Sequence, residues 1–180
     1  RNLSPYQDNI LLNLTTCTLI FFGGIGFLVI MDVLKRRNFR KLALHSKVVL
    51  TTSIVLIVLG TVLLKFTEHI SWMGAFFHSI SARTAGFSTY SIGEFTNAGL
   101  FVLCVLMFIG ASPGSTGGGI KTSTFFVLAQ STRSMFSKQA VGAFKRSISS
   151  QNVSKAYAIS MLSALVVIVA TFLLCVLEPE

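Results

Sequence analysis

Charged residues are scarce in this sequence of 180 amino acids: Asp, Glu, Lys and Arg make up 12% of it, about half the fraction usual in soluble domains. Acids are the rarer kind, with six Asp and Glu against 15 Lys and Arg, so the net charge is +9. Most basic residues fall in two short clusters between apolar blocks, at residues 35–47 and 133–155. This placement argues against binding of nucleic acid, which needs basic residues on a polar surface.

Cysteine is also rare. Cys17, Cys104 and Cys175 each lie inside an apolar block, and no CxxC spacing occurs. An odd number of cysteines without paired spacing supports neither a disulfide framework nor a zinc site. The sequence shows no paired carboxylates, no nucleophile–base set and no metal-ligand cluster, so it predicts neither an enzyme nor a bound cofactor.

Apolar residues are abundant instead, at 52% of the chain, and the mean hydropathy is +0.74. A bilayer crossing takes about 20 mostly apolar residues. Three blocks are long enough to cross: residues 10–31, 48–66 and 156–177. The sequence therefore predicts a multi-pass membrane protein. The glycines of the first block (Gly23, Gly24 and Gly26) are interpreted as small residues that let helices pack closely.

The two basic clusters indicate how the crossings are oriented. Short connections rich in Lys and Arg stay in the cytoplasm, so we expect both clusters on that side and residues 67–97 outside. Five of the six acids lie on the predicted outer side: Asp8, Glu68, Glu94, Glu178 and Glu180. The chain begins with Arg1 and ends just after an apolar block, so we expect it to be part of a longer chain.

Residues 67–97 hold a segment that does not fit a crossing. Residues 70–82 are moderately apolar, but a helix of that length spans about 20 Å, less than a hydrocarbon core of about 30 Å. They predict a re-entrant helix. Residues 81–89 (SARTAGFST) follow, rich in small side chains around Gly86. On spacing alone, this segment fits a carbonyl-lined cation pore as well as an outer loop with a turn glycine.

The apolar block at residues 97–131 is too long for one crossing and is interrupted at residues 110–121 (GASPGSTGGGIK). Five glycines and a proline within twelve residues predict a break in the helix. The stretch superficially resembles a phosphate-binding loop. However, Ile120 separates Gly119 from Lys121 and no strand precedes the glycines, which argues against nucleotide binding.

The re-entrant helix, the Thr84-Ala-Gly-Phe87 segment and the glycine-broken helix, in this order, resemble the Ktr/Trk/HKT superfamily of potassium transporters. The resemblance is closest to the bacterial membrane subunits of the Ktr and Trk systems and covers nearly the whole chain. It implies an all-α polytopic membrane protein in which helix–pore loop–helix repeats surround a central pore, as in potassium channels.

The family template also implies how the chain is divided. Residues 48–133 would be one complete helix–pore loop–broken helix repeat. Residues 1–47 would hold an outer segment, the second helix of the preceding repeat and a basic cytoplasmic connection. Residues 134–155 would form the next basic cytoplasmic connection, and residues 156–180 the first helix of the following repeat.

The resemblance assigns roles to individual residues. The ion selectivity filter would be formed by Thr84, Ala85, Gly86, Phe87 and Ser88, with K⁺ held by the backbone carbonyls of Thr84, Ala85 and Gly86. An intramembrane gating loop below it would comprise Gly110, Ser112, Pro113, Gly114, Ser115, Thr116, Gly117, Gly118, Gly119 and Lys121.

Arg83 adjoins the expected filter, where an unpaired positive charge would repel a cation. We therefore expect this side chain to pair with an acid outside the pore, and Glu94 is one candidate within the chain.

The function implied is that of a pore-forming subunit of a potassium uptake transporter in the plasma membrane, with coupling to Na⁺ left open. The alternative is a non-conducting structural or assembly subunit of a membrane complex. The expected partners are membrane lipid, a second copy in a homodimer and a cytosolic ring of nucleotide-binding regulatory subunits.

Overall fold

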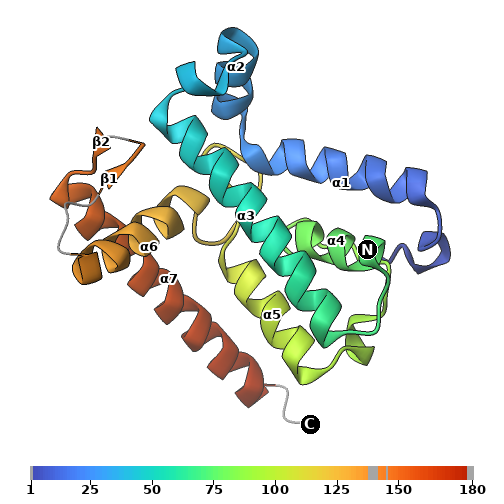
Figure 1. Ribbon diagram of the computed structural model, residues 1–180. Helices are drawn as coiled ribbons and strands as arrows, with labels where there is room; N and C mark the ends of the chain where they lie inside the picture. Colours follow the sequence, from blue (N-terminus) through green and yellow to red (C-terminus); the bar gives the residue numbers. More distant parts are fainter. Residues whose placement is uncertain (1, 138–141, 145, 178–180) are drawn as a thin grey trace. The chain divides into compact units, whose positions relative to one another are not determined.

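The computed structural model describes residues 2–137, 142–144 and 146–177, and these are predominantly helical (Figure 1). The chain divides into two compact units, Arg1–Ser123 and Thr124–Glu180.

The first unit is built from α1 to α5, followed by the start of α6. The bounds are Ile10–Ile25 for α1, Phe27–Arg36 for α2, Leu44–Thr67 for α3, Trp72–Ser81 for α4, Asn97–Phe108 for α5 and Thr122–Ser137 for α6. A single 3-10 turn at Ser4–Tyr6 precedes α1, and two more lie between the helices, at Phe39–Lys41 and Ile92–Glu94. The long helix α3 packs against α4 and α5, and α1 packs against α4 (Figure 1).

The helix lengths fit a membrane protein. Among the described residues, α3 and α7 (Ser150–Leu177) are long and apolar enough to cross a membrane, and α1 with α2 would add a third span as one bent pair. The predicted blocks at residues 48–66 and 156–177 fall within α3 and α7. Most apolar side chains of α7 are exposed, as expected of a helix that lies in lipid.

The structure of the first apolar block, residues 10–31, differs from the prediction. It is not one helix, because α1 and α2 meet at 95°. Gly26 lies at the bend with φ +88°, a conformation that side chains with a Cβ avoid. Close packing alone is therefore the wrong interpretation for Gly26. Gly26 also ends one helix and lets the chain turn into the next.

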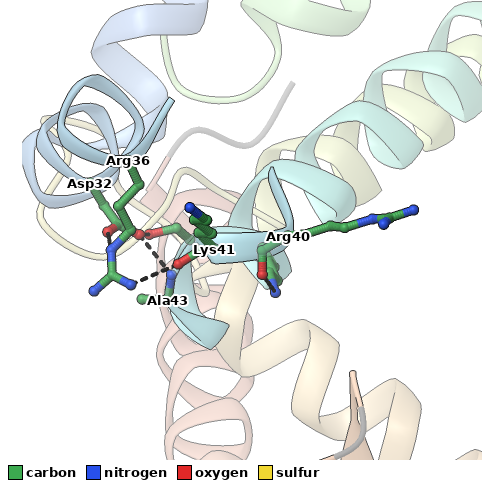
Figure 2. A network of polar contacts seen from close by, with 7 residues as sticks. Asp32, Arg36, Arg40, Lys41 and Ala43 are labelled. Atoms are coloured by element: carbon green, nitrogen blue, oxygen red, sulfur yellow. Dashed lines mark hydrogen bonds and ion pairs between the residues drawn. The ribbon is translucent and has the colours of Figure 1, made fainter. Parts of the chain in front are cut away.

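The α2–α3 connection is held by one carboxylate (Figure 2). Asp32 accepts hydrogen bonds from the Ala43 amide at 2.8 Å and the Ser46 hydroxyl at 2.7 Å. Arg36 pairs with Asp32 at 2.7 Å and donates to the Lys41 carbonyl at 2.7 Å. The basic residues of this connection are thereby folded into a compact turn.

The second unit contains most of α6, a short hairpin and α7. Strands β1 (Gly142–Ala143) and β2 (Arg146–Ser147) pair antiparallel, and Gln130 of α6 donates to the Gly142 carbonyl at 2.8 Å. Among the expected charges of this region, Lys138, Lys145, Glu178 and Glu180 lie outside the described residues.

Gly60 marks the closest approach between the helices of the first unit. A Cβ at this position of α3 would lie 2.5 Å from the Ser79 hydroxyl on α4 and 2.8 Å from a methyl carbon of Leu106 on α5. Small residues allow such close crossings within a membrane.

Gly60→Ala in the full-length protein should therefore destabilise it by about 1–3 kcal/mol through overpacking. A thermal melt in detergent measures this loss. Gly24→Ala is the matched control, because Gly24 is also helical and has nothing within 4 Å of an added Cβ. Equal melting temperatures for the two variants would contradict the close crossing.

Candidate functional site

The short helix predicted at residues 70–82 is present as α4. Ser71 caps its first turn by accepting a hydrogen bond from the Gly74 amide at 3.0 Å. The helix has ten residues and is thus about 15 Å long. It is buried over most of its length, against α3 and α1. A buried helix of this length ends inside the protein and delivers the chain that follows it there.

The chain after α4 is irregular. The Ala85 amide donates to the Ser81 carbonyl at 3.0 Å, and Thr84 and Gly86 have φ values of +76° and +74°. Glycine adopts this region readily, but a β-branched residue such as threonine does so at a cost of about 1–3 kcal/mol. Such a conformation persists only where the surroundings hold it, and it is a feature of functional segments.

Side chains of α4 hold the far end of this segment. The Ser81 hydroxyl accepts from the Phe87 amide at 2.9 Å and also donates to the Phe87 carbonyl. Nε2 of His78 accepts from the Tyr90 amide at 3.3 Å. The Leu3 amide, from the start of the chain, donates to the Ser88 carbonyl at 2.7 Å.

In the expected filter, the carbonyl oxygens of Thr84 and Ala85 differ from those of Phe87 and Ser88. The Phe87 carbonyl accepts a hydrogen bond from the Ser81 hydroxyl, and the Ser88 carbonyl accepts one from the Leu3 amide. Within the part of the chain that the structure describes, the carbonyl oxygens of Thr84 and Ala85 accept none. These two oxygens are therefore available to a ligand.

The break predicted at residues 110–121 is also present, since α5 ends at Phe108 and α6 begins at Thr122. Its base is held by backbone hydrogen bonds. The Ile120 amide donates to the Phe108 carbonyl at 3.0 Å, and the Ala111 amide to the Gly118 carbonyl at 3.3 Å. A Cβ at Gly110 would overlap the Gly118 carbonyl oxygen. The loop is thus a closed, bonded structure.

Lys121 is half-buried and donates to the Gly117 carbonyl within the same loop at 2.6 Å. Its charged group is therefore held by backbone dipoles of the loop itself.

The loop and the irregular segment after α4 lie against each other. A Cβ at Gly117 would overlap the Thr84 hydroxyl. Both segments also line one cavity of about 610 Å³, closed on another side by α1. The lining residues from the two segments are Arg83, Thr84, Ala85, Phe87, Ala111 and Thr116. Two stretches selected separately in the sequence thus meet at one site.

Glu94, the candidate named as the acid partner of Arg83, does not pair with it among the described residues. Arg83 is 9% exposed and donates to Ser53 on α3, to the hydroxyl at 3.2 Å and to the carbonyl at 3.5 Å. No acid pairs with it within the described residues. The reason is its place: the side chain is buried against α3, where oxygens of a neighbouring helix are the nearest acceptors.

The sequence reasoning did not identify His78 and Leu3 as residues that hold the segment. Each acts on a residue that is distant in the chain, through one hydrogen bond, and such pairs leave no local pattern. Of the residues that hold the segment, Ser81 at the end of α4 is the one that lies next to it in the sequence.

Comparison with known proteins identifies the family. The family model of TrkH, a cation transport protein, matches residues 42–179. The chain belongs to the TrkH family.

Individual relatives agree with this TrkH membership. The Ktr system potassium uptake protein B of Vibrio alginolyticus is 38% identical over 98% of the chain and 42% of its own length. The potassium/sodium uptake protein NtpJ of Enterococcus hirae is 33% identical over 96% of the chain and 41% of its own length. The chain thus spans about two-fifths of the length of these relatives.

The fold has a solved counterpart as well. The crystal structure of the potassium transporter TrkH from Vibrio parahaemolyticus superposes with a TM-score of 0.73, at 20% identity, over 93% of this chain and 39% of that one. The prediction of a helical, multi-pass membrane protein is confirmed.

The bonded base of the loop generates a prediction for this TrkH-family chain. Gly110→Ala should break the Ala111–Gly118 contact, because the added methyl group overlaps the Gly118 carbonyl. A lost hydrogen bond and the strain together correspond to about a tenfold rise in local opening. The rate of thiol labelling at a cysteine introduced at Ser115, in an otherwise cysteine-free full-length protein, measures that opening.

Gly118→Ala is the control for this experiment, because nothing lies within 4 Å of a Cβ at Gly118. It should label at the rate of the parent protein. Similar rates in all three proteins would contradict a bonded loop base.

Proposed function

We propose that the full-length protein is the pore-forming subunit of a potassium uptake transporter in the plasma membrane. Family membership and the names of the relatives, potassium uptake and potassium/sodium uptake proteins, support the class of function. The observation that carries the proposal is the contact between the irregular segment after α4 and the glycine-rich loop beside a common cavity. The rest of the longer chain would supply the other filter segments.

The proposed filter is Thr84 to Ser88, with K⁺ held by the carbonyls of Thr84, Ala85 and Gly86. Carbonyl oxygens replace the water shell of a cation in such filters. The proposal is supported by the positive φ values of Thr84 and Gly86, which turn successive peptide groups away from the regular directions of a helix or strand. The C-terminal end of α4, just before the filter, adds a partial negative charge that favours a cation.

The proposed gate is the loop from Gly110 to Lys121. Its position against Thr84 supports this role, because a loop in contact with a filter residue obstructs the path of an ion that leaves the filter. Lys121 adds a positive charge that raises the barrier for a cation.

The proposed topology and partners follow the family. Residues 48–133 form a complete repeat, residues 1–47 and 156–180 carry helices of its neighbours, and the basic connections, including residues 134–155, are cytoplasmic. A second copy of the protein and a cytosolic ring of nucleotide-binding subunits are the proposed partners. We propose K⁺ as the transported ion, and the flux experiment below includes Na⁺ as the second ion.

Gly86→Ser tests the filter in the full-length protein. Serine at φ +74° costs about 1–2 kcal/mol and disturbs the neighbouring carbonyls. The preference for K⁺ over Na⁺ should therefore fall about tenfold, as measured by uptake of each ion into proteoliposomes.

Gly93→Ser is the control, since Gly93 lies outside the filter and a Cβ there would meet only the Ser91 hydroxyl, at 4.0 Å. An unchanged apparent affinity for K⁺ and an unchanged ion preference in Gly86→Ser would count against the filter. No flux from the unaltered protein would favour the non-conducting subunit.

Deletion of residues 115–117 tests the gate. These residues include the contact with Thr84 but leave the Ile109–Ile120 bridge at the base of the loop. Maximal K⁺ flux should rise several-fold because the obstruction is shortened, with the ion preference of the filter nearly unchanged. A rigid spacer predicts misfolding or loss of transport instead. Flux at or below the unaltered level, in a correctly inserted deletion variant, would contradict the gate.

A further inference from the structure

The bend between α1 and α2 leaves backbone groups to be satisfied. The last four carbonyls of a helix have no partner within that helix, and the first four amides of the next helix likewise lack one. In a bilayer no water is present to replace these partners, so each unsatisfied group is costly. A 95° bend at Gly26 in an apolar block therefore needs hydrogen bonds from elsewhere in the protein.

The glycine-rich loop supplies them. The Ser112 amide donates to the Gly24 carbonyl at 3.0 Å, and the Ser112 hydroxyl lies within hydrogen-bond distance of the Gly24 and Ile25 carbonyls. On the other side of the bend, the Phe27 amide donates to the Gly114 carbonyl at 3.4 Å. Ser112 is fully buried. The loop thus caps the end of one helix and the start of the next.

Gly26 makes this contact sterically possible. A Cβ there would lie 2.8 Å from the Pro113 carbonyl oxygen and 3.2 Å from the backbone of Gly114. These neighbours are backbone atoms, which cannot rotate away as a flexible side chain does. The bent helix and the docked loop therefore fit each other only with glycine at this position.

We propose that Ser112 and Gly26 form a latch that couples the position of the loop to the bend of α1 and α2. When the loop is docked, Ser112 holds the Gly24 and Ile25 carbonyls. When the loop leaves, the same carbonyls regain partners if the helix straightens, because the amides of Leu28 and Val29 are then four residues ahead of them. The inference rests on the proposed gating function of the loop.

The Gly24 and Ile25 carbonyls thus have hydrogen-bond partners in both arrangements, which suits the bend to switching. Straightening would carry the far end of α2 with it. That end holds Asp32 and Arg36, which organise the basic connection (Figure 2). The latch therefore links the proposed gate to the connection between α2 and α3.

Gly26→Ala tests the latch in the full-length protein. Alanine favours a continuous helix and clashes with the docked loop, so the ratio of straight to bent forms should rise about fivefold or more. Two measurements report on the change. The distance between spin labels at Leu11 and Leu34, which are both exposed, should lengthen towards about 35 Å, the separation in a straight helix. Maximal K⁺ flux into proteoliposomes should rise several-fold, with the K⁺ over Na⁺ preference unchanged.

Gly93→Ala is the matched control, since a Cβ there would meet only the Ser91 hydroxyl, at 4.0 Å, and Gly93 lies outside the filter, the loop and the bend. It should leave both the label distance and the flux unchanged. A label distance that does not lengthen in Gly26→Ala overturns the proposed straightening. A longer distance with unaltered flux overturns the coupling.

Ser112→Ala provides a second, independent variant and decides the outcome if Gly26→Ala fails to insert. It removes the hydroxyl that is within hydrogen-bond distance of the Gly24 and Ile25 carbonyls, so maximal K⁺ flux should rise. Ser91→Ala is the control, because Ser91 is exposed and lies outside the site, and it should leave the flux unchanged. Unaltered flux in Ser112→Ala overturns the latch. If deletion of residues 115–117 raises flux in the same preparation, the gate stands without the latch. If the deletion also fails to raise flux, the gate itself is wrong.

Discussion

The first unit depends on one constraint: irregular backbone inside a membrane protein must find its hydrogen-bond partners within the protein. Three irregular segments meet this constraint through hydrogen bonds within the protein. The segment after α4 is held by Ser81, the loop after α5 by backbone bonds across its base, and the bend at Gly26 by Ser112. Because the partners of the bend at Gly26 belong to the loop after α5, neither of these two segments can be rearranged without consequences for the other.

Glycine allows these segments to approach each other at backbone distance. Gly26 lies against Pro113 and Gly114, Gly110 against Gly118, and Gly117 against the Thr84 hydroxyl. Two of these contacts join backbone to backbone, where any side chain would intervene. The glycines therefore do more than weaken a helix, because they set which surfaces can touch. The resulting contacts place the proposed filter, the proposed gate and α1 around one cavity.

The misjudged residues show where reasoning from the sequence ends. The sequence predicts an acidic partner for Arg83 because the charge of a side chain can be read directly from its residue type. The structure gives Arg83 the hydroxyl and carbonyl of Ser53, 30 positions earlier in the chain, as acceptors, while its Nε has no hydrogen-bond partner among the described residues. Gly26 was grouped with Gly23 and Gly24 because all three are small residues in one apolar block. Only the backbone geometry separates a glycine with φ +88° from glycines within a regular helix.

Composition, block lengths and two short motifs determined the membrane class, the family, the short helix at α4 and the break after α5. Each of these depends on residues that are close together in the chain, so the sequence carries the signal directly. The tertiary structure alone decided the 95° bend and the contacts that join the segments. Ser112 and Gly24 are 88 positions apart, and no local pattern marks a serine as the cap of so distant a helix. Such contacts arise only when the packing of α1, α3 and α4 has brought the irregular segments together, because their orphaned backbone groups then have no other partners.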